Sequence, residues 1–92
     1  MEKYLPIGTV VMLKGGSKSV MIYGRRQSRV GEKVEHDYLA CLFPEGNINE
    51  NFMYLFNHED IAEVLHYGLN NDEEKQYNKN LIKMVSDFKE GE

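Results

Sequence analysis

Short apolar runs, each bounded by turn-forming residues, dominate the first two thirds of the chain. They are rich in β-branched and aromatic residues and too short for stable helices, so they predict β-strands. The expected strands are residues 9–14, 19–25, 37–43, 52–56 and 61–67. The last run also fits a turn and a half of helix, but the glycine and the asparagine pair that follow it favour a strand.

The connections between these runs contain the residues that turns require. The glycine pair at 15–16 predicts a hairpin between the first two strands. Residues 26–35 are polar and basic, and they predict a long hairpin loop. Pro44 and Gly46 predict a tight turn. Residues 57–60 predict a single 3₁₀-like turn, with the leading asparagine as its cap.

The C-terminal residues follow a helical pattern instead. Asn71 and Glu74 have the spacing of a capping box, and the acidic residues at 72–74 suit the positive end of a helix dipole. Five apolar residues then fall on one helical face: Tyr77, Leu81, Met84, Val85 and Phe88. This pattern predicts an amphipathic helix over about residues 72–89.

Five short strands, a tight turn before the last strand and one helix predict a mainly β fold. We expect a small five-stranded SH3-like barrel or a strongly bent antiparallel sheet, with the amphipathic helix at the C-terminus. An OB-like barrel is the main alternative. The 92 residues make one domain, in which the β core spans about residues 5–68.

The predicted strands are apolar on both faces, whereas strands with one solvent-exposed face alternate apolar and polar residues. In residues 10–13, 38–43 and 53–56, both alternating sets are apolar. One set can fill a small core, and a single helix can cover only part of the other. The sequence therefore predicts an exposed apolar patch, a feature that often marks an interaction site. The alternative is a slightly larger core that the helix and the long loop cover.

Charge is distributed unevenly along the chain. The net charge is −4, but residues 1–34 carry seven Lys/Arg and two Glu, whereas residues 35–92 carry four Lys and thirteen Asp/Glu. Such a dipolar chain steers charged partners, unless its two halves neutralise each other in the fold. Cys41 is the single cysteine, so no intrachain disulfide is expected. Without a signal core or an apolar run of membrane-spanning length, we expect a cytoplasmic protein.

No residue pattern predicts catalysis, a cofactor or a metal. The three histidines, His36, His58 and His66, lack zinc-type spacing with cysteines. The serines lack a nucleophile elbow, and the glycine pair lacks the rest of a phosphate-binding loop. We therefore expect no enzymatic activity. The basic loop keeps nucleic-acid binding as a minor alternative, because the chain as a whole is acidic.

Six phrases of the sequence occur in an order that is typical of one known family. They are residues 5–11, 13–16, 21–25, 37–38, 44–46 and 56–61. Together they resemble the bacterial domain-of-unknown-function family 4176, over about residues 4–75. The resemblance implies a small cytoplasmic protein of a Gram-positive bacterium, encoded beside type VII (ESX-like) secretion genes and LXG-domain toxins. It implies no catalytic residue, because the family has no established enzymatic activity. The residues that recur in the family are mostly turn and cap residues.

The sequence and this resemblance predict a non-enzymatic adaptor, or targeting chaperone, that binds the helical targeting region of an LXG toxin for type VII secretion. Apolar anchors and a charged rim would make the contact. The candidate residues are Tyr23, Arg25, Phe43, Tyr54, Phe56, His58, Glu59 and Asp60. The alternatives are an immunity protein that binds the toxin domain and a small nucleic-acid-binding regulatory domain. We expect no cofactor, metal or membrane partner, and a homodimer also fits the pattern.

Overall fold

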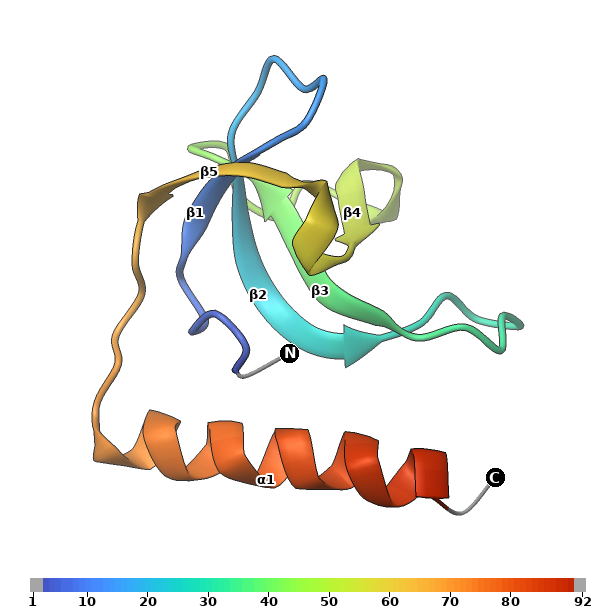
Figure 1. Cartoon of the computed structure of the whole chain (residues 1–92). Coiled ribbons are helices and arrows are strands. Elements are labelled where there is room, and N and C mark those ends of the chain that lie inside the picture. The colour runs from blue at the N-terminus through green and yellow to red at the C-terminus, as the bar shows by residue number, and fades with distance from the viewer. Residues whose placement is uncertain (1–2, 91–92) are drawn as a thin grey trace.

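A computed structural model describes residues 3–90, with side chains described as far as Met84. The strands are β1 (Val10–Leu13), β2 (Val20–Gln27), β3 (His36–Leu42), β4 (Met53–Phe56) and β5 (Ile61–His66). Two 3₁₀ turns, η1 (Glu50–Phe52) and η2 (His58–Asp60), precede β4 and β5, and helix α1 (Asp72–Glu90) ends the fold (Figure 1). The five expected strands, the turn before the last strand and the C-terminal helix are confirmed. The long hairpin loop is shorter than predicted, because β2 continues to Gln27.

The strands form one antiparallel sheet in the order β4-β3-β2-β1-β5. Within the described chain, β4 and β5 are edge strands, so the sheet is open and is not closed into a barrel. The strongly bent sheet, and not the SH3-like barrel, is therefore the observed form. Register shifts in the β2–β3 and β1–β5 pairs account for the bend, because β-bulges increase strand twist. Figure 1 shows β2 and β3 curving along their length.

One face of the sheet, which we call the inner face, holds the hydrophobic core. Its buried strand residues pair with one another across the sheet: Val11, Val20, Ile22, Tyr38, Ala40 and Phe56. Tyr4 from the N-terminal segment and Leu81 from α1 complete this cluster. The N-terminal segment and α1 therefore lie on the inner side of the sheet (Figure 1).

The N-terminal segment, residues 3–9, is held by side chains and not by strand pairing alone. The backbone N–H of Tyr4 donates to Asn78 Oδ1 at 2.9 Å, and Asn78 Nδ2 donates to the carbonyl of Tyr4 at 2.6 Å. The N–H of Leu5 donates to the hydroxyl of Tyr38 at 2.8 Å. These bonds join the segment to the helix on one side and to the sheet on the other.

The same segment crosses the linker that follows β5. A Cβ on Gly68 would lie 2.1 Å from the carbonyl oxygen of Ile7, so a side chain at this position cannot be accommodated. The N–H of Gly68 donates to Thr9 Oγ1 at 3.0 Å, which fixes the crossing. This close approach directs the chain from β5 to the start of α1 on the inner side.

Helix α1 begins as predicted but buries a different face. The N–H of Glu74 donates to Asn71 Oδ1 at 2.9 Å, which caps the helix. Leu81 is buried in the core, whereas Tyr77 and Met84 are exposed. The predicted stripe is therefore wrong at these two positions, since Asn78 takes the buried place beside Leu81. Val85 and Phe88 lie outside the described side chains.

No helix in the described part of the chain combines the length and the hydropathy that a membrane span requires.

Candidate functional site

The opposite face of the sheet, which we call the outer face, is apolar as well. The register places Val10, Met21, Cys41 and Met53 in one row across four strands, and it pairs leucines on β3 and β4 beside them. The outer face comprises Val10, Met12, Met21, Tyr23, Leu39, Cys41, Met53 and Leu55. Val10 and Cys41 are buried among their neighbours, and the other six are half-buried. Because α1 lies on the inner side, no described helix covers the outer face.

Methionine is concentrated on this face. Met12, Met21 and Met53 are three of the five methionines in the chain. Their unbranched thioether side chains adapt to partners of different shape, and they are frequent on adaptable protein-binding surfaces. Tyr23 adds an aromatic ring, and burial raises the pKa of its hydroxyl, with a smaller contribution from nearby Cys41. The composition of the outer face is suited to binding a protein.

A groove of about 390 Å³, which we call the outer groove, lies at one end of this face. Residues 27–30, at the end of β2 and in the following loop, form one wall. Leu39, Met53 and Leu55 contribute the apolar side chains, and η1 closes the other wall. The groove provides a concave apolar place for a large side chain of a partner.

Two of the predicted aromatic anchors are accessible, and the other two belong to the inner face. Tyr23 lies half-buried on the outer face, and Phe43, just after β3, is 44% exposed. Phe56 is only 4% exposed, and Tyr54 packs against the core. The prediction that Tyr54 and Phe56 are surface anchors is therefore wrong. They alternate along β4 with the outer-face residues and therefore point to the inner face.

Arg25 is buried and serves the fold instead of the surface. Its guanidinium donates two hydrogen bonds to the carboxylate of Glu74, at 2.5 and 2.9 Å, and one to the carbonyl of Leu5 at 3.3 Å. It also lies 5.3 Å from the centre of the Tyr77 ring. Burial acts to raise the pKa of Glu74, but hydrogen bonds from Arg25 and Asn78 lower that pKa below its usual value. Arg25 thus joins the sheet, the N-terminal segment and α1.

The predicted turn at residues 57–60 is present as η2. The N–H of Asn57 donates to Asp60 Oδ2 at 2.8 Å, which closes the turn. The side chains of Glu59 and Asp60 are exposed beside the first residues of β5. They remain available to a partner, although Asp60 also has a structural role.

His58 belongs to an aromatic cluster that the sequence analysis missed. Its Nδ1 lies 3.0 Å from the hydroxyl of Tyr38, and its ring centre lies 5.6 Å from that of Tyr4. Its backbone N–H donates to Asp37 Oδ2 at 3.0 Å. Burial lowers the pKa of the imidazole, and this effect outweighs the opposite one of Asp37 and Glu59. Burial thus favours the neutral imidazole, and His58 holds η2 against the core.

The arginines of the basic loop, Arg26 and Arg29, are paired with carboxylates. Arg29 Nε lies 3.3 Å from Glu32 Oε1, and Arg26 lies 3.5 and 3.8 Å from the carboxylates of Glu35 and Asp37. Arg26 and Arg25 thus join the basic first part of the chain to the acidic remainder. The uneven charge of the sequence is partly cancelled in space.

Among residues 3–84, no three side chains of His, Cys, Asp or Glu gather closely enough to hold a metal ion.

Comparison with known families confirms the resemblance seen in the sequence. A family model described as a domain of unknown function (DUF4176) matches residues 4–77, which include the whole sheet and the first turns of α1. The comparison with curated proteins and that with solved structures gave no match. The matched region contains every outer-face residue and the aromatic cluster around His58.

Proposed function

We propose that this chain, which belongs to the DUF4176 family, is a non-enzymatic adaptor that binds another protein through the outer face of its sheet. The observation that carries the proposal is a five-stranded sheet that is apolar on both faces and has its described helix on one side only. Contiguous apolar surfaces of this kind mark interaction sites. The family itself is one of unknown function, and the apolar outer face is what supports binding.

The partner that we propose is the targeting region of an LXG toxin, which the binding would prepare for type VII secretion from the cytoplasm. Such regions are long helices, and an amphipathic helix binds by placing the apolar residues of one side in a hydrophobic groove. Met12, Met21 and Met53 would adapt to the helix, and the outer groove would receive one large side chain. Tyr23 is the accessible aromatic anchor on this face.

The two alternatives differ in how well the surface supports them. An immunity protein would bind the toxin domain through the same outer face. The two roles are therefore distinguished by which fragment of the toxin binds. Nucleic-acid binding has less support, because the arginines of the basic region are buried or paired with carboxylates.

The experiment is co-purification with an LXG toxin encoded beside this protein, used whole, as the N-terminal targeting region and as the C-terminal toxin domain. We expect the whole toxin and the targeting region to co-purify, and the toxin domain alone to be lost. Retention of the toxin domain only would establish the immunity role. A protein that binds neither fragment but binds RNA or DNA at moderate salt would overturn the proposal. Light scattering with size-exclusion chromatography would separate a heterodimer from a homodimer.

A further inference from the structure

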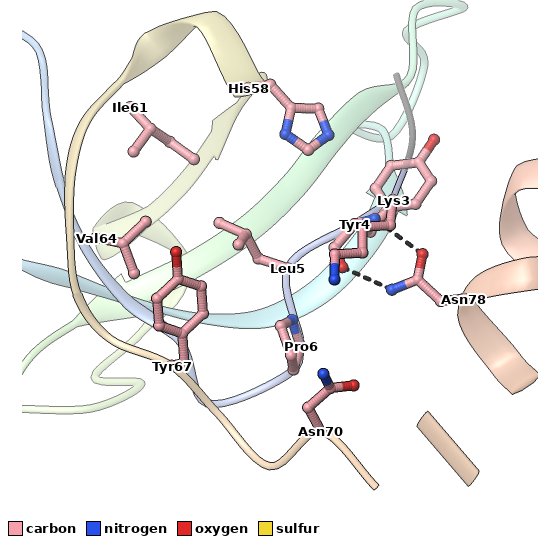
Figure 2. Close-up of a pocket in the computed structure, with 10 residues that line it drawn as sticks. All are labelled: Lys3, Tyr4, Leu5, Pro6, His58, Ile61, Val64, Tyr67, Asn70 and Asn78. Carbon is pink, nitrogen blue, oxygen red and sulfur yellow. Dashed lines mark hydrogen bonds between the residues drawn. The ribbon is translucent and has the colours of Figure 1, made fainter. Parts of the chain in front are cut away.

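A cavity of about 610 Å³, which we call the inner cavity, lies on the inner side of the sheet next to β5 (Figure 2). Four parts of the chain line it: the N-terminal segment, η2 with β5, the linker after β5, and α1. Its volume falls within the range of about 300–1,000 Å³ that is usual for small-molecule sites. It lies on the face opposite to the one that we propose as the protein-binding surface.

The cavity exists because the described residues cover the inner side of β5 incompletely. Among the described side chains of α1, Asn78 and Leu81 are buried, and they contact the N-terminal segment and the core. Ile61 and Val64, on the inner side of β5, remain half-buried, and both line the cavity. Figure 2 shows these two side chains facing Leu5 across the open space. The fold therefore leaves an apolar hollow beneath its edge strand.

The polar groups of the cavity favour an anion. The ten described residues that line it include one lysine, Lys3, and no Asp or Glu, although the chain has fifteen such residues. Lys3, Tyr67 and Asn70 make no side-chain hydrogen bond or ion pair with the described residues. Each carries a hydrogen-bond donor that can reach an acceptor on a ligand. Aliphatic walls with a few donors suit a ligand that has an apolar body and one anionic end.

We propose that the inner cavity binds a small amphiphilic carboxylate, of the size of a medium-chain fatty acid. Its apolar body lies against Leu5, Ile61 and Val64, and its carboxylate faces Lys3. Burial of the apolar body provides most of the affinity, and the charge of Lys3 selects a carboxylate over a cation. The inference does not depend on the proposed adaptor function, because it uses no residue of the outer face.

The first test compares three ligands that have aliphatic chains of the same length and different head groups: octanoate, octanol and octylammonium. Each is titrated into the full-length protein and followed by two-dimensional ¹H–¹⁵N NMR. We expect saturable binding of octanoate, with shifts at Val64, Tyr67 and Asn78. Octanoate that does not bind at millimolar concentration would overturn the proposal. Equally tight binding of octylammonium, or chemical-shift changes at residues of the outer face, would also overturn the proposal.

The second test separates the head group from the walls. Lys3→Gln should weaken octanoate binding roughly two- to fivefold, the effect of one partly exposed charge pair, and leave octanol binding unchanged. Lys14→Gln, on an exposed lysine outside the cavity lining, is the matched control and should change neither affinity. Equal affinities of the two lysine variants for octanoate would contradict the assigned head-group position.

The wall is tested by exchanges that the fold tolerates. Tyr67 lines the cavity yet is 64% exposed, so Tyr67→Ala should fold and weaken the binding of both octanoate and octanol. Phe43→Ala is the control, because Phe43 is also exposed and does not line the inner cavity. Val64→Trp, checked for folding by circular dichroism, should fill the cavity and abolish binding. A folded Val64→Trp protein with unchanged affinity would place the ligand elsewhere.

Discussion

The buried ion pair between Arg25 and Glu74 should contribute strongly to the attachment of α1 to the sheet. The two side chains are 5% and 11% exposed, so both charges are largely removed from water. Glu74→Gln keeps the shape of the side chain and leaves the guanidinium of Arg25 buried without its counter-charge. Removing one partner of such a pair costs about 3–5 kcal/mol. We expect about 3 kcal/mol, because the amide oxygen still accepts one hydrogen bond from Arg25.

This loss is large for a protein of this size, whose total stability is expected at roughly 5–14 kcal/mol. Urea unfolding at pH 7, followed by circular dichroism, measures it directly. Glu73→Gln is the matched control, because Glu73 is exposed in the same helical turn and its interaction with the helix dipole is worth about 0.3–1 kcal/mol. Equal losses of stability in the two variants would refute the assigned role of Glu74.

A compensating exchange tests the cause of the loss. The double variant Arg25→Met with Glu74→Leu replaces the pair by apolar side chains of similar size. Such replacements of buried pairs are often neutral or stabilising. The double variant should therefore be more stable than Glu74→Gln alone. A double variant that is less stable than Glu74→Gln would show that packing around Leu5 and Tyr77, and not the unpaired charge, controls the site.

Three further predictions concern pH, the loop and the core. Because burial lowers the pKa of folded His58, stability should fall as the pH drops below about 6.5, the usual histidine value, and His58→Gln should flatten this slope in urea titrations. An unchanged slope would contradict the assignment. Shortening residues 28–35 to a tight turn should change stability by about 1 kcal/mol or less, and a variant that unfolds in native buffer would show that the loop is structural. Phe56→Asp should leave the domain unfolded, so that a thermal melt shows no cooperative transition. Phe43→Asp should lower the free energy of unfolding by about 0.5 kcal/mol or less.

The sequence predicted the elements of the fold because their signals are local. Short apolar runs between Gly, Pro and Asn residues gave the strands, and Asn71 with the following acidic residues gave the start of α1. Local patterns could not predict whether the sheet closes into a barrel. Closure depends on register shifts between strands, such as the one between Ile22 and Gly24, which no local pattern reveals.

The candidate site was predicted less well, because a strand that is apolar on both faces does not show which face is covered. Tyr54 and Phe56 were therefore assigned to the surface although they lie against the core. Arg25 was also assigned to the surface, because its partner Glu74 is 49 positions away in the sequence. Asn78 was not singled out, because a polar helix residue normally faces solvent.

The most direct test of the central claim is the affinity of the toxin's targeting region for two leucine variants, measured by titration calorimetry. Leu55→Asp changes the outer face at the outer groove, and Leu69→Asp changes an exposed leucine near the start of α1, outside the outer groove. We expect that Leu55→Asp, shown by circular dichroism to be folded, loses at least about 2 kcal/mol of binding free energy, or roughly thirtyfold in affinity. Leu69→Asp should bind as tightly as the unmodified protein. A folded Leu55→Asp protein with undiminished affinity would contradict the claim that the outer face is the binding surface.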